Sequence, residues 1–108
     1  MDEQEFRQRA DEALNDLNQA LIDAGEKHEF EADFSSGALT VEFEDPPTRF
    51  VVSPNAPVRQ IWVSALSKSY KLDWDAGKGT FVLADSGETL NELLARVISQ
   101  QIGQSISL

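Results

Sequence analysis

The sequence contains no cysteine and a single histidine, His28. Without thiols there can be no disulfide bond, no thiolate metal ligand and no thiol nucleophile. No apolar run approaches the roughly 20 residues that a membrane span needs. The first residues are acidic, where a signal peptide is basic and then apolar, and they lack the arginine-rich character of a transit peptide. These absences predict a cytoplasmic protein that does not bind membranes.

Positive charge is also scarce. Nine lysines and arginines face nineteen aspartates and glutamates, for a formal net charge of -10. Such a field repels nucleic-acid phosphates and attracts cations or a basic protein surface. Acidity that only maintains solubility is the alternative interpretation. Because of the repulsion from phosphates we expect no nucleic-acid partner. Whether the carboxylates are spread or concentrated decides between a surface for cations or a basic protein and acidity that only maintains solubility.

Two amphipathic helices are predicted, one near each end of the sequence. The chain of 108 residues can bury one core but not two, so a single domain over residues 1–108 is expected. Apolar residues recur at helical spacing over about residues 4–24, and Gly25 is the expected stop signal. The same spacing returns over residues 90–102, and Gly103 follows it.

A cap is predicted before the second helix. Asp85 and Glu88 have the three-residue spacing of a capping box, and Ser86 is the alternative cap. After this helix, Ile106 and Leu108 are expected to fold back onto the core. The second helix should thus be fixed at both ends.

Between the helices, apolar and polar residues alternate with a period of two, which is typical of strands with one buried face. The predicted strands cover residues 28–34, 38–44, 48–53, 58–64, 68–74 and 80–83. Asp45-Pro46-Pro47 is expected to be a turn, and residues 54–57 a loop. The predicted fold class is α+β, a two-layer α/β sandwich. Its N- and C-terminal helices pack on one face of an antiparallel sheet of about five to seven strands.

Four acidic residues of the first predicted helix share one flank. They are Glu5, Glu12, Asp16 and Asp23. At about 100° per residue they lie roughly 100 to 140° to one side of the apolar stripe centred on Leu17. Glu12 and Asp16, four residues apart, form a like-charge pair that costs a few tenths of a kcal/mol in an isolated helix. The flank is either a solvated face that aids solubility or a surface for a cation or a basic partner.

More carboxylates follow this helix directly, at Glu26, Glu29, Glu31 and Asp33. If the first strand lies beside the acidic helix flank, they extend it into one continuous patch. Carboxylate oxygens suit hard cations such as Fe³⁺, whereas a tight transition-metal site normally adds imidazole or thiolate. The lone His28 is expected to be a surface residue, so metal binding should be weak, multi-site and sensitive to salt. The predicted metal sites are Glu12, Asp16, Asp23, Glu26, Glu29, Glu31 and Asp33.

A tryptophan is predicted on the polar face of the fourth strand. In a period-two strand Trp62 stands between Gln60 and Ser64, on the side away from the core. It either packs against a neighbouring-strand residue such as Tyr70 or anchors an interface, where tryptophan is over-represented. Trp74 precedes a turn and is expected to pack in or beside the core.

Three segments in a fixed order carry a resemblance to a known family. Residues 57–64 read Pro-x-x-Gln-aliphatic-Trp-aliphatic-Ser, residues 70–73 read Tyr-x-aliphatic-Asp, and residues 86–94 open the second helix with Ser-Gly-x-Thr and end in Leu-Leu. With Gly37-Ala38-Leu39-Thr40-Val41 and Gln100-Gln101-Ile102-Gly103, the similarity extends over essentially the whole chain. The sequence therefore resembles the bacterial frataxins, which implies two helices on one face of an antiparallel sheet.

The resemblance also implies a function in iron–sulfur cluster assembly. It implies a protein that binds iron (Fe²⁺ or Fe³⁺) weakly through carboxylates and that has the cysteine desulfurase and the scaffold protein as partners. The residues carried over are Asp23, Glu29, Glu31 and Asp33 for an acidic ridge, and Asn55, Gln60 and Trp62 for a contact on the sheet. Such a protein presents iron or regulates the desulfurase–scaffold complex. It is a monomer, with iron-dependent oligomers left open.

Other functions remain as alternatives. A ferroxidase-like protein that oxidises and stores iron is one, and an unrelated acidic adaptor with the same fold is another. Catalysis needs groups positioned in a water-limited pocket, whereas this sequence offers carboxylates on an exposed flank. We therefore expect a binding protein and no enzyme. The chain has Asn18 and Gln19 where bacterial relatives often carry carboxylates, and Lys27 interrupts the acidic run, so the ridge should be less dense.

Overall fold

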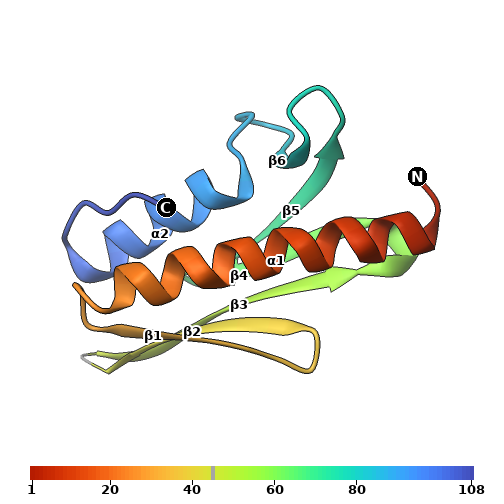
Figure 1. Ribbon diagram of the computed structural model, residues 1–108. Coiled ribbons are helices and arrows are strands. Elements are labelled where there is room, and N and C mark those ends of the chain that lie inside the picture. The colour runs from red at the N-terminus through yellow and green to blue at the C-terminus, as the bar shows by residue number, and fades with distance from the viewer. Residues whose placement is uncertain (45) are drawn as a thin grey trace.

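The computed structural model describes residues 1–44 and 46–108, which form two layers (Figure 1). The helices are α1 (Glu3–Gly25) and α2 (Leu90–Ile102), and a short 3₁₀ helix, η1 (Ala56–Val58), precedes β4. The strands are β1 (Phe30–Ser35), β2 (Ala38–Glu44), β3 (Pro47–Asn55), β4 (Gln60–Ala65), β5 (Lys68–Asp75) and β6 (Thr80–Leu83). They form a 6-stranded antiparallel sheet in chain order, with both helices on one side of it (Figure 1). The predicted α+β sandwich is confirmed.

The core lies between the sheet and the helices. On α1 the apolar stripe is buried, and it consists of Phe6, Ala10, Leu14, Leu17 and Leu21. On α2 the buried residues are Leu90, Leu93, Leu94, Val97 and Ile98. Ile106 and Leu108 pack against this core, as predicted. Within the described ranges, no helix is long and apolar enough to cross a membrane.

The strand register determines what the outer face of the sheet, away from the helices, carries. Glu31 on β1 lies opposite Glu42 on β2, which in turn lies opposite Arg49 on β3. Further along the sheet, Trp62 on β4 lies opposite Lys71 on β5. Residues directly opposite one another point to the same face. Because these positions are exposed while their strand neighbours are buried or half-buried, both rows belong to the outer face.

The end of α1 differs from the prediction. Gly25 is the last residue of the helix, and the cap is Glu26 with a right-handed φ of -66°. A Cβ at Gly25 would lie 2.7 Å from the Phe30 carbonyl oxygen, so the glycine permits a close approach of β1 to the helix. The chain turns immediately after α1, where the amides of Lys27 and His28 donate to the Ala24 carbonyl. As a result β1 begins at Phe30 and not at residue 28.

The boundaries of β3 and β4 also differ. β3 continues to Asn55, so half of the loop predicted over residues 54–57 is strand. β4 begins only at Gln60, because η1 ends with Arg59 in the left-handed conformation at a φ of 55°. The turn predicted at Asp45-Pro46-Pro47 lies partly outside the described residues, since Asp45 is not among them; Pro47 already belongs to β3.

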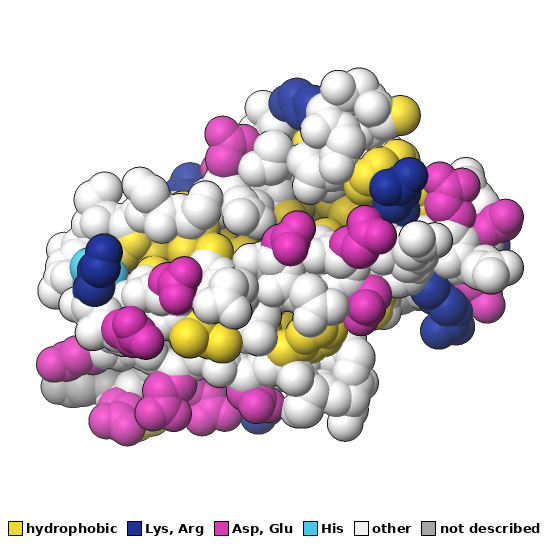
Figure 2. All heavy atoms as spheres, in the orientation of Figure 1, with side chains coloured by type: hydrophobic (Ala, Val, Ile, Leu, Met, Phe, Trp, Pro, Cys, Tyr) yellow, Lys and Arg dark blue, Asp and Glu magenta, His cyan; other side chains and the backbone are white. Residues whose placement is uncertain are grey.

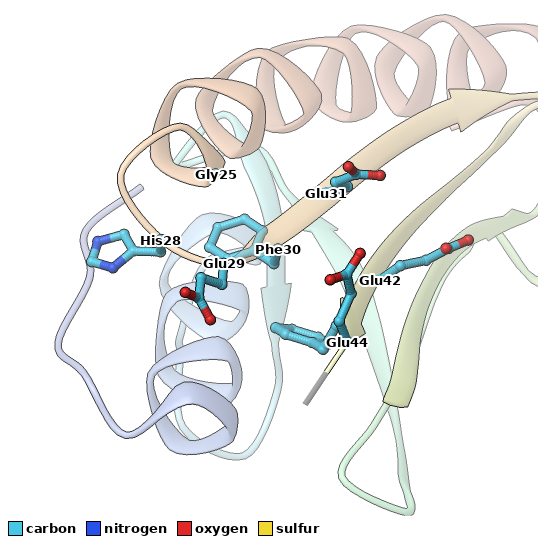
Figure 3. Close-up of a pocket in the computed structure, with 8 residues that line it drawn as sticks. Gly25, His28, Glu29, Phe30, Glu31, Glu42 and Glu44 are labelled. Carbon is cyan, nitrogen blue, oxygen red and sulfur yellow. The ribbon is translucent and has the colours of Figure 1, made fainter. Parts of the chain in front are cut away.

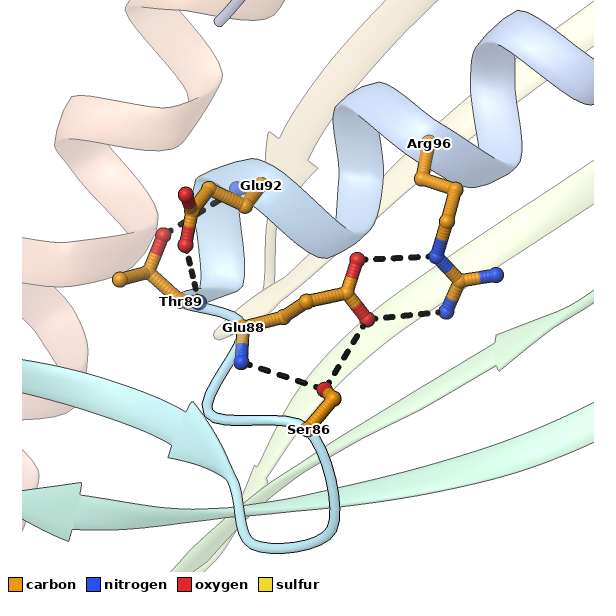
Figure 4. A network of polar contacts seen from close by, with 5 residues as sticks. All are labelled: Ser86, Glu88, Thr89, Glu92 and Arg96. Carbon is orange, nitrogen blue, oxygen red and sulfur yellow. Dashed lines mark hydrogen bonds and ion pairs between the residues drawn. The ribbon is translucent and has the colours of Figure 1, made fainter.

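α2 begins with a capping box, one turn later than expected (Figure 4). The Thr89 hydroxyl accepts from the Glu92 amide at 3.2 Å, and the Glu92 carboxylate accepts from the Thr89 amide at 2.9 Å. The box predicted at Asp85 and Glu88, and the alternative cap at Ser86, were therefore wrong. Thr89 and Glu92 have the required spacing and immediately precede the buried stripe of α2.

Glu88 forms an ion pair instead of a cap (Figure 4). Arg96 donates to its two carboxylate oxygens at 2.9 and 3.0 Å, and the Ser86 hydroxyl contacts the same group at 3.2 Å. The hydrogen bonds and the charge of Arg96 hold the pKa of the Glu88 carboxyl below its ordinary value, although partial burial opposes this. The guanidinium also lies 5.9 Å from the ring of Tyr70. This pair links α2 and the loop that leads into it.

Candidate binding surfaces

The acidic flank of α1, called here the helix row, faces the C-terminal tail. The row consists of Glu5, Glu12, Asp16 and Asp23. Asp23 lines a hollow together with Ile106 and Leu108 of the tail. Arg9 lies seven residues before Asp16, hence on the same flank, and its guanidinium is 5.3 Å from the ring of Trp74 on β5. The helix row is therefore on the side of α1 that faces β5 and the tail.

β1 lies beside the opposite flank of α1. Asp11 lines a hollow with Phe34 and Gly37, which lie at the turn between β1 and β2. Asn18 lies seven residues after Asp11 and so shares its flank, and Ile22, 40% exposed, follows one turn later. The condition for one continuous acidic patch is thus not met. Figure 2 shows acidic side chains along α1 and along the β1–β2 edge, with neutral and apolar surface between them along most of α1; at the left, where α1 leads into β1, the two groups approach each other.

Four glutamates gather where β1 begins and β2 ends. Glu29, Glu31, Glu42 and Glu44 line one open hollow, and we call them the strand cluster. In Figure 3 the carboxylates of Glu31, Glu42 and Glu44 lie on the same side of the hairpin. The His28 ring points away from them and contacts the Gln104 side chain at 2.8 Å. Glu29 and Glu31 were predicted site residues, whereas Glu42 and Glu44 were missed.

The remaining predicted acidic residues lie near these two groups without joining the hollow. Asp33 is on the outer face opposite Thr40, and its carboxylate accepts from the Ser35 hydroxyl at 2.8 Å. Glu26 is the exposed C-terminal cap of α1 and, with Asp23, lines the hollow beside the C-terminal tail. The structure therefore brings Glu29 and Glu31 together and leaves Asp33 two residues further along β1 on the same face. Glu12 and Asp16 lie on the flank of α1 away from β1, whereas Glu26 is only three residues before Glu29.

No ion pair among the described residues involves the strand cluster, although Arg49 on β3 lies directly opposite Glu42. The ion pairs in the described part of the chain join Arg7 to Glu3, Arg9 to Glu12 and Arg96 to Glu88, so none involves the cluster. Glu31 and Glu42 are directly opposite, an arrangement of like charges that is destabilising by roughly 0.2 to 1 kcal/mol. Over residues 1–44 and 46–108 no three His, Cys, Asp or Glu side chains are arranged to hold a metal ion. The cluster offers a cation exposed oxygens and no closed cage.

Trp62 lies on the outer face, as its alternation predicted, and is 38% exposed. Its indole N–H donates to the side-chain carbonyl oxygen of Gln60 at 2.9 Å, and the side-chain NH₂ of Gln60 donates to the Asp73 carboxylate at 3.1 Å. The Lys71 ammonium lies 5.0 Å from the centre of the Trp62 ring. Tyr70 is opposite Val63 on the inner face, so the alternative in which Trp62 packs against Tyr70 is wrong.

Asn55 on β3 and Trp74 on β5 lie next to these residues. Asn55 is opposite Gln60 at the end of β3, where it also lines the hollow that Asp11 of α1 lines. We call Gln60, Trp62, Lys71 and Asp73 the tryptophan surface, and Asn55 lies at its edge. Trp74 packs against the core and makes an edge contact with Phe81 at 5.2 Å, as expected.

Fold and surfaces together define a class: a small α+β sandwich whose candidate sites are open, with carboxylates and a tryptophan on the free face of its sheet. A model of the frataxin-like domain matches residues 1–104. The protein named iron-sulfur cluster assembly protein CyaY from Azotobacter vinelandii is 36% identical over 100 residues, which cover 91% of this chain and 90% of that protein. Its namesake from Pseudomonas fluorescens strain Pf0-1 is 31% identical over 103 residues, covering 95% and 91%. The chain belongs to the frataxin family.

Solved structures agree on the fold. Frataxin from Psychromonas ingrahamii superposes with a TM-score of 0.84 at 23% identity, over 99% of this chain and 97% of that one. Yeast frataxin superposes with a TM-score of 0.71 at 24% identity, over 93% and 82%. The two-layer arrangement is thus retained at low sequence identity.

Proposed function

We propose that this protein serves iron–sulfur cluster assembly as a binding protein that presents iron to, and regulates, the complex of cysteine desulfurase and scaffold. The relatives that share most of its length are named for that process. The observation that carries the proposal is the common face: the strand cluster and the tryptophan surface both lie on the side of the sheet that the helices leave free. One partner complex can contact both at once.

In this proposal the strand cluster steers and holds a basic partner. Its four carboxylates are exposed, and none forms an ion pair with an arginine or lysine of the described residues, although Arg49 is the cross-strand neighbour of Glu42. Attraction between such a patch and a basic surface accelerates association and weakens as salt rises. Binding of the desulfurase should therefore become weaker with increasing ionic strength.

Iron is cargo in this proposal and binds the same carboxylates weakly. Glu29 and Glu31 gain Glu42 and Glu44 as neighbours, so this hollow concentrates more oxygen ligands than the separate positions on α1. Hard cations accept such carboxylate and water ligands. Of the predicted helix sites, Glu12 already contacts Arg9 at 4.0 Å, which reduces its attraction for a cation. We place iron first at the strand cluster and second at Asp16 and Asp23.

Trp62 supplies the apolar part of the contact. Tryptophan at the centre of an interface often dominates the binding energy, and removing it typically costs 2 kcal/mol or more. The test is the affinity of the purified protein for its own organism's desulfurase–scaffold complex. Trp62→Ala should weaken binding at least about tenfold. Ile22→Ala, which removes an exposed apolar side chain from α1 instead, should change it less than about twofold. Equal effects of the two variants would refute the role of Trp62.

An iron titration tests the cargo and separates it from the ferroxidase alternative. Paramagnetic broadening of amide resonances should appear first at residues 29–31 and 42–44, and only at higher iron concentration at residues 16–23. Aerobic oxidation of Fe²⁺ should proceed no faster than with a variant whose strand cluster is converted to glutamine. Faster, catalytic oxidation by the unmodified protein would instead support the ferroxidase alternative.

A further inference from the structure

We infer that Asp73 is a positioning residue for the tryptophan surface: through Gln60 it fixes the orientation of the Trp62 indole and keeps the indole N–H occupied. The inference rests on the proposed function of Trp62 as a partner contact. Two hydrogen bonds in series carry it, from Trp62 to Gln60 at 2.9 Å and from Gln60 to Asp73 at 3.1 Å. All three side chains are on the outer face, on the adjacent strands β4 and β5.

The chemistry of the three groups permits only one direction for this chain of bonds. A carboxylate only accepts hydrogen bonds, so Gln60 must turn its NH₂ group toward Asp73. Its carbonyl oxygen then faces Trp62, whose indole N–H can only donate. Each group thereby has the partner that it needs, and the carboxylate determines the orientation of the amide. Without Asp73 the amide of Gln60 can rotate and present its own donor to the indole.

The face of the indole is restrained as well as its edge. Lys71, opposite Trp62 on β5, places its ammonium 5.0 Å from the centre of the ring. A cation over an indole face is attracted by the ring quadrupole. Trp62 is nevertheless 38% exposed, so the ring is held in one orientation while part of it remains open to a partner. A contact residue that is already ordered loses less entropy on binding.

The arrangement also defines which partner groups fit. Because the indole N–H already bonds to Gln60, a hydrogen-bond acceptor on the partner gains nothing at that atom. The group that meets Trp62 should be apolar or a planar guanidinium, which contacts the open part of the ring. This distinguishes the tryptophan surface from the strand cluster, where charge alone selects the partner.

Nuclear magnetic resonance of the free protein tests the positioning, since the two tryptophans give only two indole N–H signals. Trp74→Phe assigns them. In Asp73→Ala the Trp62 indole signal should shift upfield and its heteronuclear NOE should fall, and Asp73→Asn, which keeps an acceptor, should restore both. Asp85→Ala removes the same charge from the exposed loop before α2 and should leave the signal unchanged. An unchanged indole signal in Asp73→Ala overturns the inference.

Binding to the desulfurase–scaffold complex tests the functional consequence separately. Asp73→Ala should weaken affinity about fivefold, from loss of preorganisation, and Asp73→Asn should recover most of it. If Trp62→Ala leaves affinity intact, the proposed contact fails, and the indole signals alone then decide the positioning. If Trp62→Ala weakens binding but Asp73→Ala does not, the inference that orientation matters to the partner is overturned.

Discussion

The two acidic surfaces of this protein differ in how the fold balances their charge. On α1, Arg9 approaches Glu12 at 4.0 Å and Gln19 donates to Asp23 at 3.3 Å. In the strand cluster, Glu31 is directly opposite Glu42, and neither forms an ion pair among the described residues, although Arg49 lies opposite Glu42 on β3. Carboxylates that are held in no ion pair are available to a ligand. We therefore propose the strand cluster as the first site for the partner and for iron.

Among the substitutions considered, the largest loss of stability is expected at Gly25, where α1 ends and the chain turns toward β1. Gly25→Ala places a Cβ 2.7 Å from the Phe30 carbonyl oxygen, a backbone atom that cannot move without shifting β1. We expect a loss of about 2 kcal/mol in the free energy of unfolding, measured by urea denaturation. Gly77→Ala is the control, because its Cβ would approach only the end of the Asp75 side chain, at 3.2 Å. If Gly25→Ala is as stable as the unmodified protein, the close packing of α1 against β1 is contradicted.

Among the described residues Glu88, unlike the glutamates of the strand cluster, forms an ion pair with an arginine, Arg96. Glu88→Gln should cost about 1 kcal/mol near neutral pH, because it removes the charge from the bidentate contact with Arg96. The pKa of Glu88 is lowered in the folded protein, so its contribution is present above the ordinary pKa of a glutamate and is lost as the pH falls through the lower folded value. Denaturation curves of the two proteins should therefore converge in acid. A difference that grows as the pH falls would contradict the ion pair.

Neutralising a glutamate of the strand cluster should stabilise the protein, whereas neutralising Glu88 should destabilise it. Glu31→Gln removes a like charge opposite Glu42 and leaves Glu42 facing Arg49, so it should stabilise the protein by about 0.5 kcal/mol at low salt. The matched variant Glu12→Gln loses a weak contact with Arg9 and should be neutral or slightly destabilising. Thermal denaturation at two salt concentrations measures both, and the gain from Glu31→Gln should shrink as salt screens the repulsion. Equal gains in the two variants would mean that the two surfaces do not differ in this way.

The sequence was sufficient for the fold and for the side on which Trp62 lies. Strict alternation over residues 38–44 predicted β2 with its observed boundaries, and the same period placed Trp62 away from the core. Glu42, a member of the strand cluster that was missed, could also have been predicted from the sequence. The two-residue turn Ser36-Gly37 pairs Ser35 with Ala38, and that register brings Glu42 opposite Glu31.

The side of α1 on which β1 lies could not be predicted in this way. Helical periodicity shows that Asp16 and Asn18 lie on opposite sides of the buried stripe of α1. Which of the two flanks faces β1 depends on how the helix is placed across the sheet, a tertiary property that no local pattern encodes. The chain has the neutral Asn18 on the flank beside β1 and the charged Asp16 on the other. For that reason the expected continuous ridge is divided in the structure.

Charge reversal on the two surfaces tests the central claim most directly. Glu31→Lys with Glu42→Lys, and Glu12→Lys with Asp16→Lys, change the net charge equally but on different sides of the molecule. We predict that the first pair weakens binding to the desulfurase–scaffold complex at least about tenfold, and the second less than about threefold, at matched salt. Circular dichroism should confirm that both variants are folded. If the helix pair weakens binding as much as the strand pair or more, the assignment of the partner surface to the outer face of the sheet is wrong.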